Sequence, residues 1–288
     1  MWRRERWVGV AYILPAFFVL GLVLFFPYLF AAYLSFNRVS PLLETTYAGL
    51  ANFARALQDR VFLIGVQNTL VLVLFSQIIA FVLALSGAMA LRERTALNSV
   101  IRVVLLIPWA IPGVVTALTW KWILDGHFGI LNQLLASTGI VDRYVSWLAS
   151  PDYALGAVII VNVWRSYPFT LLMLLAGLQA IPDELYEAAA IDGASPWQRF
   201  AYITLPIMRP VIAITIILTA IWDFKTFDLV WILTGGGPGY ATEILPTLIY
   251  KTAFSRLDFG YASAIALLMA LIMIVPISIY IRSTTRTR

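Results

Sequence analysis

The chain of 288 residues is 61% hydrophobic and only 12% charged, whereas about a quarter of the residues in a typical soluble domain are charged. With a mean hydropathy of +0.87, this composition excludes a water-soluble globule and a disordered chain. The absence of cysteine excludes disulfides and thiolate–metal sites, the single histidine (His127) excludes histidine-cluster chemistry, and a net charge of +5 on so apolar a chain argues against nucleic-acid binding. We predict an all-α, polytopic membrane protein.

A helix that crosses the membrane needs about 20 predominantly apolar residues. Six segments meet this requirement, so six membrane-spanning helices are predicted. The uncharged first segment is too long for a cleaved signal peptide and is expected to stay in the membrane. Residues 1–60 are interpreted as an N-terminal helix with its outer loop, and residues 61–288 as a core of five helices. In chain order the spans cover about residues 7–37, 61–91, 103–120 (extending to about 124), 155–180, 207–233 and 259–281.

Lys and Arg gather in the cytoplasmic connections of membrane proteins. If the N-terminus is cytoplasmic, eleven of the 20 Lys and Arg fall in inner segments, six in outer segments and three within spans. Both termini are therefore predicted to be cytoplasmic. The longer connections, at about 38–60, 125–152 and 234–258, then lie on the outer side.

The inner connection between the fourth and fifth spans, residues 181–206, has the pattern of a helix–turn–helix. Pro182 suits the first position of a helix, and Asp183 and Glu184 suit the positive end of its dipole. Gly193 stands where the end of this helix requires a left-handed residue. The three acidic residues 183, 184 and 187 are interpreted as a helix start rather than a metal cluster.

A second short helix is predicted over about 196–202, capped by Ser195. Helices of this length are marginal in water unless they pack on a partner. Acidic residues argue against the anionic inner leaflet as that partner. The apolar Tyr186, Trp197 and Phe200 therefore favour docking to a cytoplasmic protein.

At this point the sequence resembles a family. The run Glu187-Ala188-Ala189, followed by Gly193 and then by Ile203, Leu205 and Pro206, matches in spacing the EAA…G…I-LP signature of ATP-binding-cassette (ABC) importer permeases. The resemblance extends over about 61–282. Three further motifs are similar to the carbohydrate-uptake branch, which includes maltose, trehalose and glycerol-phosphate permeases: Asn162-Val-Trp-Arg-Ser-Tyr-Pro-Phe169, Trp222-Asp-Phe-Lys-Thr-Phe-Asp228 and Leu233-Thr-Gly-Gly-Gly-Pro238.

The resemblance implies that the loop 181–206 is a coupling element seated in a cleft of an ATPase subunit, with Glu187 and Gly193 central to the contact. It implies two ATPase copies that carry ATP and Mg, a second permease that is a different polypeptide, and an extracytoplasmic solute-binding protein, in the cytoplasmic (inner) membrane of a bacterium or archaeon. No cofactor is expected in this chain, because it has no G-x-x-x-x-G-K-[ST] sequence, and Gly235–Pro238 is interpreted as a turn. The implied coupling residues are Glu187, Ala188, Ala189, Asp192, Gly193, Ile203, Leu205 and Pro206.

Charges within spans normally face a bundle interior or a water-filled cavity. Arg165 and Asp223 each lie ten residues, about 15 Å, from the outer end of their predicted span, so we expect them to meet near mid-membrane. Two interpretations remain open: a structural ion pair, or a lining for a hydroxyl-rich solute, which the resemblance implies is a di- or oligosaccharide. The expected lining is one face of each span, made of Asn162, Arg165, Ser166 and Phe169 on the fourth and Thr219, Trp222, Asp223 and Thr226 on the fifth.

The alternative function is an ion-coupled secondary transporter that uses Arg165, Asp223 and Lys225. Such transporters usually show internal repeats and more helices, which this sequence lacks. An intramembrane enzyme would need a nucleophile–base pair or a metal triad, and His127 is interpreted as a surface residue. We therefore predict a transport subunit that is not itself an enzyme.

Overall fold

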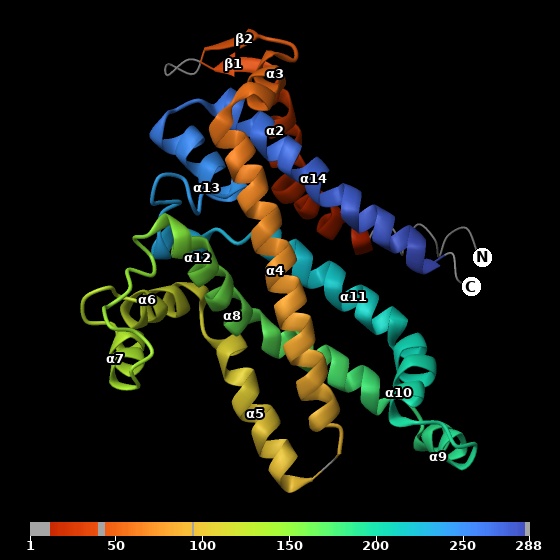
Figure 1. The fold of residues 1–288 in the computed structure, drawn as a ribbon. Helices are drawn as coiled ribbons and strands as arrows, with labels where there is room; N and C mark the ends of the chain where they lie inside the picture. Colours follow the sequence, from red (N-terminus) through yellow and green to blue (C-terminus); the bar gives the residue numbers. More distant parts are fainter. Residues whose placement is uncertain (1–11, 40–43, 94, 286–288) are drawn as a thin grey trace, which may run out of the picture. The chain divides into compact units, whose positions relative to one another are not determined.

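The computed structural model describes residues 12–39, 44–93 and 95–285, which are mainly helical (Figure 1). The two strands in this part of the chain are short, so the predicted all-α class is confirmed. The first residues of the predicted first span, 7–11, lie outside the described ranges.

The chain divides into two units, Met1–Leu63 with Leu248–Ala270 and Ile64–Thr247 with Leu271–Arg288. In the first unit, a helix over Tyr12–Ser35 ends beside a small antiparallel hairpin, and Asn52 joins the two by donating to the carbonyl oxygens of Ser35 and Asn37, both at 2.9 Å. The elements of this unit include a π-helical turn (Gly21–Phe25), α2 (Phe26–Ser35), β1 (Asn37–Val39), β2 (Thr45–Tyr47), α3 (Ala51–Gln58), a π-helical turn (Lys251–Ser255) and the start of α14 (Phe259–Thr285).

The second unit is built around one long helix, α8, against which α5 and α11 pack, while α6 packs against α12. In Figure 1, α6 and α12 lie at one end of α8 and α9 lies at the other. The helices are α4 (Arg60–Ala90), α5 (Ala96–Ala110), α6 (Gly113–Ile123), α7 (Ile130–Ser137), α8 (Pro151–Gln179), α9 (Asp183–Ile191), α10 (Pro196–Arg199), α11 (Leu205–Phe224), α12 (Asp228–Leu233) and α13 (Leu245–Tyr250), which continues into the first unit.

Four described helices are long and apolar enough to cross a membrane: Tyr12–Ser35, Arg60–Ala90, Pro151–Gln179 and Pro196–Phe224. A bent pair, α5 with α6, could supply a fifth span, and the described residues hold one shorter apolar helix, Phe259–Ile274. These segments overlap the six predicted spans, but the count of six stays a prediction.

The third predicted span is wrong as a single straight helix, because α5 and α6 meet at an angle of 94°. The chain breaks at Ile111, whose φ of −77° and ψ of 130° are extended. The residue before a proline is pushed out of the helical region, and Pro112 follows directly. The polypeptide therefore turns at this point.

The fifth predicted span is also corrected. The helix begins at Pro196, passes through a π-helical turn at Phe200–Thr204 and ends at Phe224, well short of the predicted residue 233. The second short helix of the inner loop is thus the first turn of this span rather than a separate element. Beyond a break at Lys225, α12 begins at Asp228.

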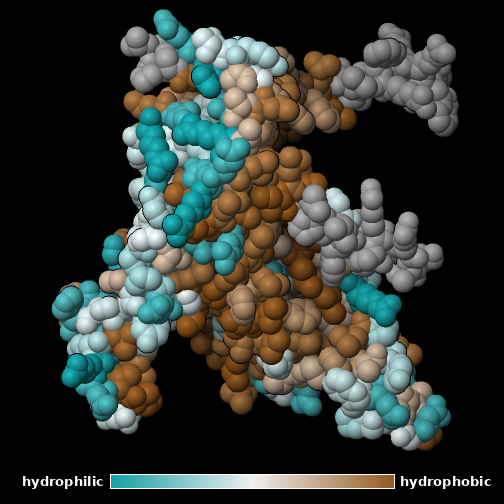
Figure 2. All heavy atoms as spheres, turned by 45° about the horizontal axis from the view of Figure 1, so that its top comes forward, coloured by the Kyte–Doolittle hydropathy of each residue, from teal (hydrophilic) through white to brown (hydrophobic). Residues whose placement is uncertain are grey.

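Small residues on α4 allow close packing inside the second unit. Ala84 and Ala88 are fully buried together with Leu174 of α8 and Met208 of α11. A Cβ at Gly87 would lie 3.1 Å from the Leu171 side chain, so the glycine allows α4 and α8 to approach closely there. Large apolar side chains remain exposed on the outer faces of the helices, the brown surface in Figure 2, as a hydrocarbon environment requires.

Candidate functional site

The inner loop folds as the sequence predicts at its turn. Gly193 has a φ of +81°, the left-handed conformation that ends α9, and the N–H of Ala194 reaches back to the carbonyl of Ala189 at 2.8 Å. Asp192 is the last residue before the turn, and Pro182 precedes the first helical residue rather than occupying it.

Ser195 caps the following helix through two reciprocal hydrogen bonds. Its hydroxyl accepts from the backbone N–H of Gln198 at 3.3 Å, and the Gln198 side-chain oxygen accepts from the N–H of Ser195 at 2.7 Å. This confirms the predicted cap. It also fixes the direction in which the chain enters the fifth span.

Helix α9 is exposed along almost its whole length, and none of its nine residues is buried. Glu187, Ala188, Asp192 and Gly193 are exposed, and the apolar Ile191 is 87% exposed. The other predicted coupling residues belong to the inner side of the loop, because Ala189, Ile203, Leu205 and Pro206 are all half-buried. The loop thus offers a short, partly apolar and acidic surface.

Contacts beneath α9, which the sequence did not reveal, hold it to the rest of the unit. Arg92, just after α4, pairs with Asp183, and its guanidinium lies 4.3 Å from the centre of the Tyr186 ring. The Tyr186 hydroxyl lies 2.8 Å from the hydroxyl of Thr204, and Gln179 donates to the carbonyl of Arg92 at 3.2 Å.

A buried polar network joins α4, α8 and α11. Asp223 accepts hydrogen bonds at 2.7 Å from the side-chain amides of both Asn162 and Gln77. The Gln77 oxygen accepts from the Thr219 hydroxyl at 2.9 Å, and Asn162 also donates to Ser76 at 3.1 Å. Only 3% of Asp223 is exposed. One carboxyl group therefore ties three helices together.

The expected pairing of Arg165 with Asp223 is not the one the structure shows. Arg165 instead makes an ion pair with Asp228 of α12 at 3.3 Å. The depth estimate assumed one helix through residue 233, whereas α11 ends at Phe224 and Asp223 stands in its last turn. Gly113 of α6 approaches the same pair so closely that a Cβ there would lie 2.7 Å from an Arg165 nitrogen and would collide with the Asp228 carboxylate.

Three aromatic side chains lie close together, and one of them, Phe169, is on α8, the helix that also carries Arg165. Phe169 lies between Trp222, with ring centres 4.7 Å apart, and Trp109, with ring centres 5.8 Å apart. Trp109 belongs to α5, Phe169 to α8 and Trp222 to α11. We call Trp109, Phe169 and Trp222 the aromatic trio.

The eight predicted lining residues fall into two groups. Asn162, Thr219, Asp223 and Thr226 are buried, so they can influence a solute only through their neighbours. Arg165, Ser166 and Phe169 are half-buried and Trp222 is 42% exposed, so these four remain available to a solute. Lys225 is exposed and lies outside the helices.

Sequence reasoning missed Ser76 and Gln77, because the second span was judged only by its lack of charge. A signal was present. Thr69 and Ser76 are seven residues apart in an apolar run and share a helix face, which Asn68 and Gln77 flank on opposite sides. In the structure Asn68 donates to the carbonyls of Tyr240 and Glu243, both at 3.0 Å, so this flank is used as well.

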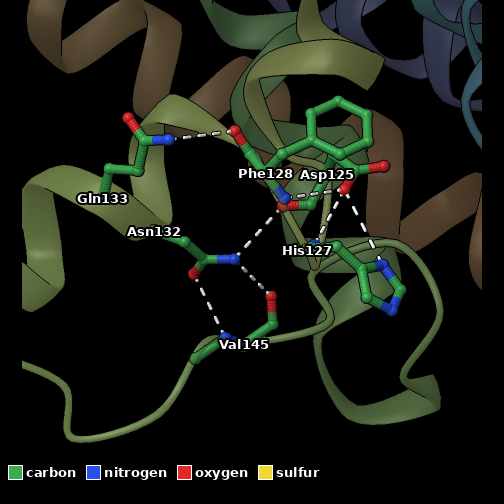
Figure 3. Close-up of polar contacts among 6 residues, drawn as sticks. All are labelled: Asp125, His127, Phe128, Asn132, Gln133 and Val145. Carbon is green, nitrogen blue, oxygen red and sulfur yellow. Dashed lines mark hydrogen bonds and ion pairs between the residues drawn. The ribbon is translucent and has the colours of Figure 1, made fainter.

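The segment between α6 and α8 contains two turns ordered by side-chain hydrogen bonds. One Asp125 oxygen accepts from the N–H groups of His127 and Phe128 at 2.8 and 3.1 Å (Figure 3), which lowers the pKa of this carboxyl below its ordinary value. Asn132 bonds to the carbonyl and N–H of Val145 at 3.0 and 3.1 Å, which holds the following loop. His127 has a side chain 94% exposed, as expected for a surface residue.

The glycine-rich segment after α12 is a turn, as predicted. Gly235 and Gly236 have φ values of +60° and +87°. Among the residues that the structure describes, no group of three or more His, Cys, Asp or Glu could hold a metal ion.

Comparison with known proteins agrees with this architecture. A family model described as "Binding-protein-dependent transport system inner membrane component" matches residues 80–288. The chain is 37% identical over 280 residues to the trehalose/maltose transport system permease protein MalF of Thermococcus litoralis, which covers 97% of this chain and 94% of that protein. It is 33% identical over 280 residues to the sulfoquinovosyl glycerol transport system permease protein SmoG of Agrobacterium fabrum, with 96% and 90% covered.

The fold also matches a solved structure. In the crystal structure of a bacterial alginate ABC transporter in complex with an alginate pentasaccharide-bound periplasmic protein, one chain superposes with a TM-score of 0.85, covering 100% of this chain and 98% of that chain at 23% identity. This similarity concerns the fold, while the family model and the two relatives concern the sequence. The chain therefore belongs to the family of binding-protein-dependent transport system inner membrane components, as a multi-pass permease subunit of an ABC importer.

Proposed function

We propose that this permease imports a sugar, a di- or oligosaccharide, that an extracytoplasmic binding protein delivers and that partner ATPases drive across the membrane through the loop 181–206. The observation that carries the coupling role is α9 itself. It is a nine-residue helix with no buried residue and with an 87% exposed Ile191 at its end. The contacts of Asp183 and Tyr186 hold only the inner side of this short helix, which gains stability from packing, so a docked protein would account for its exposed face.

The aromatic trio and the Arg165–Asp228 ion pair support a sugar as the solute. Faces of aromatic rings carry the apolar faces of sugar rings, and a partly exposed guanidinium donates to hydroxyl oxygens. The names of the relatives, trehalose/maltose and sulfoquinovosyl glycerol transport, point to carbohydrate and carbohydrate-linked solutes. The buried network of Asp223 would then position Trp222, its neighbour on α11, rather than contact the solute.

The remaining assignments follow the family. The chain itself would bind no cofactor, with ATP and Mg on two partner ATPase subunits and a second, different permease completing the membrane part. Both termini would be cytoplasmic. Because the chain has no native cysteine, single cysteines test this topology: Ser137→Cys should react with an impermeant maleimide on intact cells, while Ala190→Cys should react only after the membrane is opened.

Co-expression with ABC ATPase subunits tests the coupling role. The wild-type chain should co-purify with the ATPases, and sugar uptake into proteoliposomes should require ATP. Glu187→Lys reverses an exposed charge on α9 and should weaken both co-purification and uptake. Asp142→Lys, the same kind of reversal on the outer side, is the control and should leave co-purification unchanged. Normal assembly and uptake with Glu187→Lys would show that α9 is not the docking element.

A further inference from the structure

We propose that Tyr186 is the positioning residue through which movement of α9 is passed to two membrane helices, to α4 through Arg92 and to α11 through Thr204. The inference rests on the proposed function, in which α9 docks to an ATPase. It adds a specific mechanical connection that the coupling signature does not contain.

Tyr186 is the principal inward contact of α9. Of the nine residues in this helix, only Tyr186 and Ala189 are half-buried, and they lie three positions apart on the same face. Alanine has no polar group, so the directional contacts of the inner face belong to Tyr186. A force on the exposed face must reach the membrane helices through this side chain, through the ion pair of Asp183 with Arg92, or through the two ends of the loop.

The Tyr186 ring leads to α4. The Arg92 guanidinium lies 4.3 Å from the ring centre and also pairs with Asp183 in the first turn of α9. Arg92 is anchored in turn, because Gln179 donates to its carbonyl at 3.2 Å. Arg92, two residues beyond the end of α4, therefore moves with α9.

The Tyr186 hydroxyl leads to α11. Its partner at 2.8 Å, Thr204, is 4% exposed and lies within the continuous helix Pro196–Phe224. A cavity of about 210 Å³, lined in part by Arg92, Tyr186 and Thr204, adjoins these contacts and leaves space for the side chains to shift.

The same two helices meet again within the membrane. Gln77 of α4 donates to Asp223 of α11 at 2.7 Å and accepts from Thr219 at 2.9 Å. Arg92 lies two residues beyond α4 and Thr204 directly precedes α11, so both adjoin the helices whose relative position sets this network. A displacement of α9 through Tyr186 changes the spacing of α4 and α11 at the loop and, because both are continuous helices, at Asp223.

Single-atom variants test the connection in the complete complex with its ATPases. Tyr186→Phe removes the hydroxyl and keeps the ring under Arg92, and Thr204→Val removes the partner hydroxyl at nearly constant volume. The matched controls are Tyr47→Phe, at a tyrosine 82% exposed and outside the loop, and Thr215→Val, whose hydroxyl bonds within its own helix to the carbonyl of Val211 at 2.7 Å. The readouts are co-purification with the ATPases, ATP hydrolysis, and solute transported per ATP hydrolysed.

We expect assembly to be unchanged and the ratio of transport to hydrolysis to fall about fivefold to tenfold in Tyr186→Phe and in Thr204→Val, the factor expected from loss of one buried hydrogen bond. The double variant should be no worse than either single variant, because the two hydroxyls act as one contact. Adding Arg92→Gln to Tyr186→Phe should lower the ratio further, because the ring contact is separate. Both controls should match the wild type.

Three results would overturn the connection. The first is an unchanged ratio of transport to hydrolysis in Tyr186→Phe. The second is a double variant, Tyr186→Phe with Thr204→Val, whose loss of this ratio equals the product of the two single losses. The third is a loss of assembly that accounts for all of the lost transport. Failure of the proposed function is a different result, because the wild-type chain would then neither assemble with the ATPases nor transport sugar.

Discussion

Replacing Gln77 with leucine tests whether the buried network holds the membrane helices together. Gln77→Leu keeps a similar side-chain size and helix propensity, so its cost comes mainly from hydrogen bonds. The Asp223 carboxylate loses a donor at 2.7 Å, which is worth about 1.5–3 kcal/mol for a charged group. Thr219 loses an acceptor but still donates to the carbonyl of Thr215 at 2.7 Å, so its loss adds little. The expected destabilisation is about 2 kcal/mol, which lowers the Tm by about 4–8 °C.

The assay is thermal unfolding of the detergent-purified protein, with Gln133→Leu as the matched control. Gln133 is an exposed glutamine, and its replacement should change the stability by less than about 0.5 kcal/mol. The decisive measurement is Gln77→Leu in an Asp223→Leu background. With no carboxylate left to satisfy, the second substitution should cost little, leaving a coupling energy of about 2 kcal/mol. An equal cost in both backgrounds would refute the role assigned to the network.

Three further predictions concern Gly193 in the loop 181–206, the Arg165–Asp228 ion pair and the turn at Asp125. Gly193→Val should abolish transport, whereas Gly193→Asn should retain much of it in an uptake assay, because asparagine tolerates the observed φ of +81° and a β-branched residue does not. Gly113→Ala should fold normally, because the side-chain ends that the new Cβ meets can move, but it should lose transport because the Arg165–Asp228 pair is displaced. The control is Gly156→Ala, whose Cβ would meet nothing within 4 Å and which should transport normally. The pKa of Asp125 is lowered, so the stability that its carboxylate gives to the turn is fully present above the ordinary pKa of 3.8 and is lost as the pH falls through the lowered pKa. Hydrogen-exchange protection of the amides of residues 127 and 128 should disappear in that pH range. Asp125→Asn should remove this pH dependence.

Much of the inner loop could be predicted because its signals are local. The left-handed Gly193 and the cap at Ser195 depend on residues within one turn of each position, and both are confirmed. The long apolar helices α4 and α8 are likewise specified by composition and length, and their observed ends lie within a few residues of the predicted ones.

The errors arose where local signals were weak or were not used. The bend between α5 and α6 has a readable cause in Pro112, which a count of apolar residues overlooks. The end of α11 at Phe224 has no such marker, because neither proline nor glycine follows it directly. The expected partner of Arg165 was derived from that helix end. Because the end was misplaced, Asp223 was predicted as the partner, whereas the structure shows Asp228.

Because Pro196–Phe224 is one continuous helix, a small tilt displaces both of its ends. Its 29 residues measure about 43 Å at about 1.5 Å per residue, so a tilt of about 5° around its midpoint carries each end through about 2 Å. The Asp223 hydrogen bonds are 2.7 Å long, and a 2 Å displacement breaks them. A rotation too small to alter the packing class of the helices is therefore large enough to switch the polar contacts at the far end from made to broken.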